Sequence, residues 1–213
     1  RLINIIPEDL PIPTVVAYGF TGSEKIPSVV VKDIKGAYDL VSYIVSKGHK
    51  KIGVITGPET SKPGYDRCAG YKRALKKHNI EINENYIVRG GFKEEGAYCA
   101  MKVLMEQKEP PTAVFSCNNM TTLGCLRYMQ EKGMKLTRDI SMVCFDEIKE
   151  LEYTDIRLTS VARPIYEMGY EAMHILEKRY EDKEKRGSDR YIIRRHTVNP
   201  KLVKRGSEKY LQF

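Results

Sequence analysis

Residues 111–124 read PTAVFSCNNMTTLG, a short apolar run that stops at two asparagines, where a helical pattern begins. The run has the length and composition of a buried strand, and it ends on amide side chains with both donors and acceptors. In open α/β sheets, ligands bind in the crevice outside the carboxyl ends of the strands, so Asn118 is a candidate ligand contact. Asn is also a favoured helix N-cap, and capping is the competing interpretation of Asn118 and Asn119.

Strands alternate with single helices on both sides of this stretch. Strands are predicted near residues 51–56, 86–89 and 140–145. Apolar residues at helical spacing predict helices near residues 37–45, 65–78, 97–104 and 123–133. Such short alternation requires right-handed crossovers, so we predict an α/β fold whose parallel sheet carries helices on both faces.

The two ends of the chain depart from this rhythm. Two β-rich runs at residues 14–17 and 28–31 have no helix between them, and they need further sheet with which to pair. After Asp146, an acidic loop leads to a strand at 158–161 and to a long helix that opens at Pro164, a favoured first-turn residue. The tail, from about Tyr191 to Val203, again has strand-like residues.

Composition excludes several classes of protein. The formal net charge is +8, of which +6 comes from residues 177–209, where charges of both signs at helical spacing favour local ion pairs over a phosphate-binding stripe. Five cysteines without a C-x-x-C pair and four scattered histidines indicate a reducing, cytoplasmic compartment and no metal or cofactor. No apolar run approaches the roughly 20 residues of a membrane span.

Four side chains follow the predicted parallel strands and should meet at one edge of the sheet. They are Arg67, Phe92, Asn118 and Asp146. A donor fork, an aromatic face, an amide and a carboxylate together suit a neutral hydroxylated or heterocyclic molecule. Each has a structural alternative: Arg67 could pair with Asp66 or Glu94, Phe92 could lie in the core, and Asp146 could cap the next segment.

The sequence gives no support for catalysis. It contains no G-x-S-x-G elbow, Walker loop, H-E-x-x-H or post-strand G-x-G-x-x-G. No pair of nucleophile and base is apparent, so we expect a binding protein rather than an enzyme.

Several short matches, in order, give a family resemblance. They are VVV at 29–31, GAY at 36–38, GHKKIGVITGP at 48–58, RCAGY at 67–71, GF at 91–92, GAY at 96–98, PTAVF at 111–115, FDE at 145–147, LTSV at 158–161 and RGS at 205–207. On these residues the chain resembles the effector-binding core of the lactose-repressor (LacI/GalR) family of transcriptional regulators, which has a periplasmic-binding-protein-like fold. Departures include Asn118-Asn119 where the family has Asn-Asp, Cys144 where it has Gly, and Lys32-Asp33 where it has Asp-Asn.

The resemblance implies a small-molecule effector, a sugar or a purine-like compound, held between two lobes by Arg67, Asn118 and Asp146 with Phe92 as the aromatic wall. It also implies a homodimer that reaches operator DNA through a headpiece absent from these residues, so we expect an N-terminally truncated chain. One lobe would be complete and the other partial. The expected divisions are 1–33 (partial first lobe), 34–160 (effector-binding lobe), 161–195 (helix and tail of the first lobe) and 196–213 (closing strand and C-terminus).

Two functions follow from this resemblance. The first is ligand sensing by a LacI-type regulator, in which the effector changes operator affinity. The alternative is an extracytoplasmic solute-binding protein that delivers a sugar to a transporter.

Overall fold

The computed structural model describes residues 11–19, 25–186, 195–209 and 211. The chain divides into two compact units. The first unit combines residues 1–32 with 163–200, and the second combines residues 33–162 with 201–213. The chain therefore crosses between the units at residues 32–33, 162–163 and 200–201.

A six-stranded, mostly parallel sheet forms the centre of the second unit. Its strands, in spatial order, are β4 (Ile87–Arg89), β3 (Ile52–Thr56), β5 (Ala113–Ser116), β6 (Ser141–Phe145), β7 (Thr159–Ala162) and β9 (Lys201–Val203). Every neighbouring pair is parallel except the pair of β7 and β9. The helices are α1 (Asp33–Ser46), α2 (Lys62–Lys77), α3 (Glu94–Met105) and α4 (Asn119–Glu131). The predicted α/β class and parallel sheet are confirmed.

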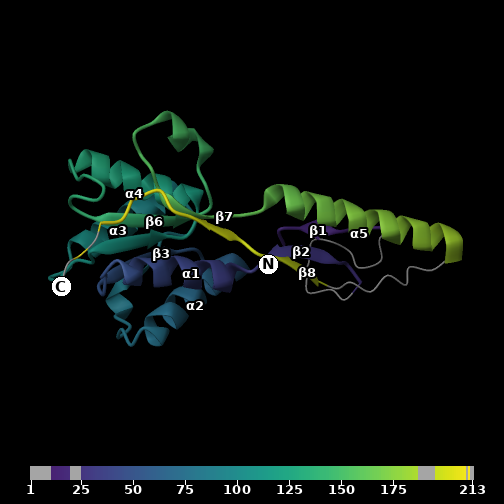
Figure 1. The fold of residues 1–213 in the computed structure, drawn as a ribbon, viewed down its shortest axis with the longest axis horizontal. Coiled ribbons are helices and arrows are strands. Elements are labelled where there is room, and N and C mark those ends of the chain that lie inside the picture. Colours follow the sequence, from purple (N-terminus) through teal and green to yellow (C-terminus); the bar gives the residue numbers. More distant parts are fainter. Residues whose placement is uncertain (1–10, 20–24, 187–194, 210, 212–213) are drawn as a thin grey trace. The chain divides into compact units, whose positions relative to one another are not determined.

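Helices cover both faces of this sheet, as Figure 1 shows for the pair α1 and α2 on one side and the pair α3 and α4 on the other. Successive side chains of a strand point to opposite faces. Ala113 and Phe115 of β5 accordingly pack in the core under α1 and α2, whereas Val114 packs in the core under α3 and α4. Because both faces are buried, the strands read as continuous apolar runs.

The strand order reverses between β3 and β5. From β3 the chain passes through α2 to β4 on one side, and then through α3 to β5 on the other side of β3. The two connections use helices on opposite faces of the sheet, so the chain leaves β3 and β5 toward different faces, which is the position where open α/β sheets generally bind ligands. The stretch that contains Asn118 ends at this reversal of strand order.

The first unit is smaller. Its three parallel strands, in the order β1 (Val16–Ala17), β2 (Ser28–Val31) and β8 (Arg195–Val198), pack against α5 (Ile165–Arg186). Among its described residues, the apolar core is formed by Val29, Val31, Met168, Ile175 and Val198, and Ile26 is also buried. Strand β8 supplies sheet with which the two early strands pair. Within the described residues, no helix has both the length and the apolar character to cross a membrane.

The strand-like tail forms two strands. β8 joins the sheet of the first unit and β9 that of the second, with Asn199 and Pro200 between them. Proline has no N–H to donate to a ladder, so pairing stops there. Residues 191–194, which are also strand-like in sequence, lie outside the described residues. Helix α2 starts three residues earlier than predicted, with Pro63 in its first turn.

Candidate functional site

Arg67 lies at the centre of a buried polar cluster at the carboxyl edge of the second sheet. It projects from α2, and only 1% of its surface is exposed. Its Nε donates a hydrogen bond of 2.8 Å to Asp33, and its Nη1 donates to the carbonyl oxygen of Cys117 and, at 3.4 Å, to Asp146. The guanidinium also stacks on Phe145, 3.7 Å from the ring centroid. One side chain thus joins α1, α2 and the ends of β5 and β6.

Asp33 is the first residue of α1, where the partial positive charge of a helix N-terminus favours a carboxylate. It is only 7% exposed. Burial raises the pKa of Asp33, and the Arg67 guanidinium opposes this shift without reversing it, while the nearby Asp146 and Asp66 carboxylates add to it. The carboxyl group of Asp33 therefore depends on Arg67 as its cationic partner.

Asp146 directly follows β6 and has a left-handed backbone conformation, with φ of 77°. This conformation is uncommon outside glycine, although Asp and Asn tolerate it better than most residues. Its N–H still bonds the carbonyl of Val161 on β7 at 3.0 Å, and its side chain pairs with Arg67. The turn at the strand end thus directs this carboxylate to the cluster, where it is 5% exposed.

The two asparagines have different roles. Asn118 is the N-cap of α4, and its side-chain oxygen accepts a hydrogen bond from the N–H of Thr121 at 2.8 Å. Capping was the alternative interpretation of both asparagines, and Asn118 takes this role because it has the extended backbone that a cap requires. Asn119 instead donates to the carbonyl of Glu147 at 3.3 Å, and its buried Oδ1 has no hydrogen-bond partner in the described part of the chain.

Phe92 follows β4, which is two strands away from β5 along the same sheet. Gly91 and Phe92 both have left-handed backbones, with φ of 66° and 60°, which form the turn after β4. The ring packs directly against Gly57 at the end of β3, because a Cβ added to that glycine would lie 2.2 Å from the ring. The structure thus brings Arg67 and Asp146 into contact, next to the Cys117-Asn118 peptide, and places Phe92 at the neighbouring strand ends.

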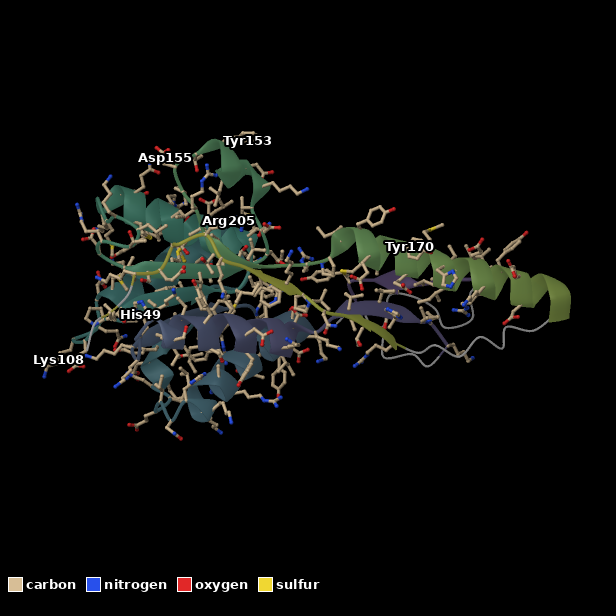
Figure 2. All side chains as sticks on the ribbon, viewed as in Figure 1. His49, Lys108, Tyr153, Asp155, Tyr170 and Arg205 are labelled. Carbon is tan, nitrogen blue, oxygen red and sulfur yellow. The ribbon has the colours of Figure 1, made fainter. Side chains whose placement is uncertain are left out.

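A second polar group adjoins Asp146 and was not predicted. Arg205, labelled in Figure 2, pairs with Glu147 and donates to the Ser160 hydroxyl at 3.0 Å and to the carbonyl of Leu158 at 3.3 Å. These side chains line a small pocket under the loop that follows β6. Its lining residues are Cys144, Glu147, Ile148, Lys149, Leu151, Ile156, Arg157, Leu158, Ser160 and Arg205. Asn119 reaches the same loop through Glu147.

Asp33 is the other residue that sequence reasoning missed as a member of the site. The sequence did mark this position, because Lys32-Asp33 stands where the family that the chain resembles has Asp-Asn. Its partner Arg67 is 34 residues away along the chain, however, so spacing alone could not pair them. In the part of the chain that the structure describes, no group of three or more His, Cys, Asp or Glu side chains could hold a metal ion.

A parallel sheet with polar side chains gathered at the carboxyl edge, beside a reversal of strand order, is the architecture of a ligand-binding α/β protein. The family model described as "periplasmic binding protein-like domain" matches residues 41–207. The chain belongs to this family.

Its relatives are transcriptional regulators. The HTH-type transcriptional repressor CytR of Escherichia coli K12 is 38% identical over 164 residues, which are 77% of this chain and 48% of the repressor. The chain thus spans about half the length of that relative. A structure described as a LacI transcriptional regulator from Bacillus cereus matches with a TM-score of 0.81 and 28% identity, over 94% of this chain and 69% of the other.

A LacI family regulator from Enterococcus faecium, solved with bound ribose, matches with a TM-score of 0.80 and 25% identity, over 94% of this chain and 72% of that one. These relatives confirm the predicted resemblance to the effector-binding core of LacI-type regulators.

Proposed function

We propose that this chain is the ligand-sensing core of a LacI-type transcriptional regulator, and that it binds a sugar or a nucleobase-like molecule. The observation that carries the proposal is the buried contact of Arg67 with Asp146 beside the Cys117-Asn118 peptide, at the strand ends where such folds bind ligands. At this position the guanidinium of Arg67 supplies hydrogen-bond donors, and the carboxylate of Asp146 and the carbonyl of Cys117 supply acceptors. The ribose bound by the Enterococcus faecium regulator supports a hydroxylated ligand.

The effector would act by population shift. A ligand changes the balance between two arrangements of a protein only if it binds one of them more tightly. Asp33 is the first residue of the second unit, directly after the chain crosses from the first unit. Because Asp33 is bonded to Arg67, a ligand that contacts Arg67 would also affect the residues at this crossing. In this proposal, operator DNA is contacted by a headpiece outside the 213 residues, in a cytoplasmic homodimer.

Repressor relatives favour this proposal over a solute-binding protein of a transporter. An enzymatic role has less support. Burial raises the pKa of the Cys117, Cys125 and Cys144 thiols, to about 12 for Cys144, so these side chains are poor nucleophiles at neutral pH.

The proposal is tested by a thermal-shift screen of the chain against sugars, sugar phosphates, nucleosides and purines. A ligand at 100 times its Kd adds about 2.7 kcal/mol to the free energy of unfolding, which is easily measured. For a hit, Asp146→Asn should weaken binding by about 1 to 3 kcal/mol in calorimetry, because a charged acceptor is lost. The amide tolerates the left-handed backbone, so the fold should persist.

Asp155→Asn is the matched control, since Asp155 is exposed on the loop after β6 (Figure 2) and its charge is removed in the same way. Equal affinities of the wild type and Asp146→Asn would remove Asp146 from the site. A screen in which no ligand raises the melting temperature would contradict the proposed function.

A further inference from the structure

The Arg67 guanidinium donates hydrogen bonds to acceptors of its own chain. Its Nε bonds Asp33 at 2.8 Å, and its Nη1 bonds the Cys117 carbonyl and Asp146. An anionic ligand gains most from a guanidinium when it takes two parallel N–H groups. Here Asp33 already uses the Nε–H, which is one of the donors in that fork.

The surroundings of this guanidinium are rich in carboxylates. Asp33 and Asp146 flank it, and Asp66, held by Lys62 at 2.6 Å, acts electrostatically on Asp33 from the preceding position on α2. Like charges repel strongly in a poorly solvated site, so a phosphate or carboxylate placed here would meet repulsion. Hydroxyl groups, in contrast, can donate hydrogen bonds to carboxylate oxygens.

We infer that Asp33 is a specificity-determining residue: by occupying Arg67 and adding a carboxylate, it makes the site select uncharged, hydroxyl-rich ligands over their phosphorylated counterparts. The inference rests on the proposed function, and it names the substrate class of that same site. Asp33 acts through Arg67 and through its charge, and it need not touch the ligand itself.

Matched ligand pairs test this selection. Calorimetry of the 213-residue chain would compare ribose with ribose 5-phosphate, glucose with glucose 6-phosphate, and adenosine with AMP. For a pair that binds, the wild type is expected to prefer the uncharged member by about tenfold or more. In Asp33→Asn the amide oxygen can still accept from Arg67 while the charge is gone, so the preference should shrink by about tenfold.

Asp39→Asn is the matched control, because Asp39 lies on the same helix, pairs with Lys35 at the surface, and loses the same charge. This variant is expected to keep the wild-type preference, as is Asp33→Glu, which retains the carboxylate. Melting curves would verify that each variant is folded.

Three results would overturn the inference alone: binding of both members of a pair with equal affinity by the wild type, equal effects of Asp33→Asn and Asp39→Asn, or loss of the preference in Asp33→Glu. In each of these cases the chain still binds an uncharged ligand, so the proposed function stands. A chain that binds no member of any pair and no compound of the wider screen would contradict the proposed function and this inference together.

Discussion

Arg67 shows how one residue can serve both folding and binding. Its guanidinium is buried with two carboxylates, and ion pairs of this kind gain little net stability because desolvation offsets the attraction. Removing only the Arg67 guanidinium has a larger effect on stability, because Asp33 and Asp146 would then remain buried without a cationic partner. The site and the packing of α1 against the sheet therefore depend on the same side chain.

Arg67→Ala is expected to lower the free energy of unfolding by about 3 to 5 kcal/mol, because it leaves two carboxylates buried without their guanidinium. Urea denaturation at neutral pH would measure the loss. Arg73→Ala, six residues further along α2 at an exposed position, should change stability by only about 0.5 kcal/mol. Similar losses in the two variants would show that the buried cluster contributes nothing specific.

Elements were predictable from the sequence where a local pattern decides them. The stripe of Ala37, Leu40, Val41 and Ile44 indicated α1, and its residues are buried in the structure. The alternation of strands with helices then implied a parallel sheet. The sequence left the cap of α4 open between Asn118 and Asn119, because adjacent asparagines have the same capping propensity and only the backbone conformation separates them.

Residues that meet across the fold were predictable only in part. Strand polarity placed Arg67 and Asp146 at one edge, since carboxyl ends of parallel strands coincide. The pairing of Asp33 with Arg67 and of Glu147 with Arg205 joins residues far apart in the chain. Neither pair leaves a periodic signal. The left-handed turn at Asp146 was equally hidden, because it depends on pairing with β7.

The turn after β4 packs tightly against the end of β3, where the Phe92 ring contacts Gly57. Gly57→Ala would place a Cβ within 2.2 Å of the Phe92 ring, so the ring has to move. We expect a loss of about 1 to 3 kcal/mol in the free energy of unfolding, typical of overpacking. The same substitution in a Phe92→Ala background should cost much less, since the ring is absent.

A double-mutant cycle on Gly57 and Phe92, followed by urea denaturation, would measure this coupling. Gly133→Ala provides a comparison, because Gly133 also follows an element of the second unit, but a Cβ there would meet nothing within 4 Å. Its left-handed backbone still adds strain, so any loss there should be the same with or without Phe92. If the effects of Gly57→Ala and Phe92→Ala on the free energy of unfolding simply add, the Phe92 ring does not pack against Gly57 as the structure shows.

At the scale of the whole molecule, the two units have very different cores. The second unit buries two apolar layers, one on each face of a six-stranded sheet. In the first unit, the described residues form one small apolar cluster between the three strands and α5. Tyr166 and Tyr170 of α5 are exposed, and Tyr170 is labelled in Figure 2. Hydrophobic burial is the main favourable contribution to folding, so the two units should differ in stability.

Native-state hydrogen exchange should therefore resolve two levels of protection. The opening reaction that exposes the amides of β2 and β8 to exchange should have a free energy at least about 1.4 kcal/mol lower than that for β5 and β6. This difference corresponds to a tenfold difference in exchange rate. Amides of β9 provide the internal control. They follow β8 closely in sequence but belong to the second sheet, so they should exchange with β7 rather than with β8. If instead β8 and β9 exchange together, at the rate of β5 and β6, the chain unfolds as one cooperative body and the division into two units has no energetic counterpart.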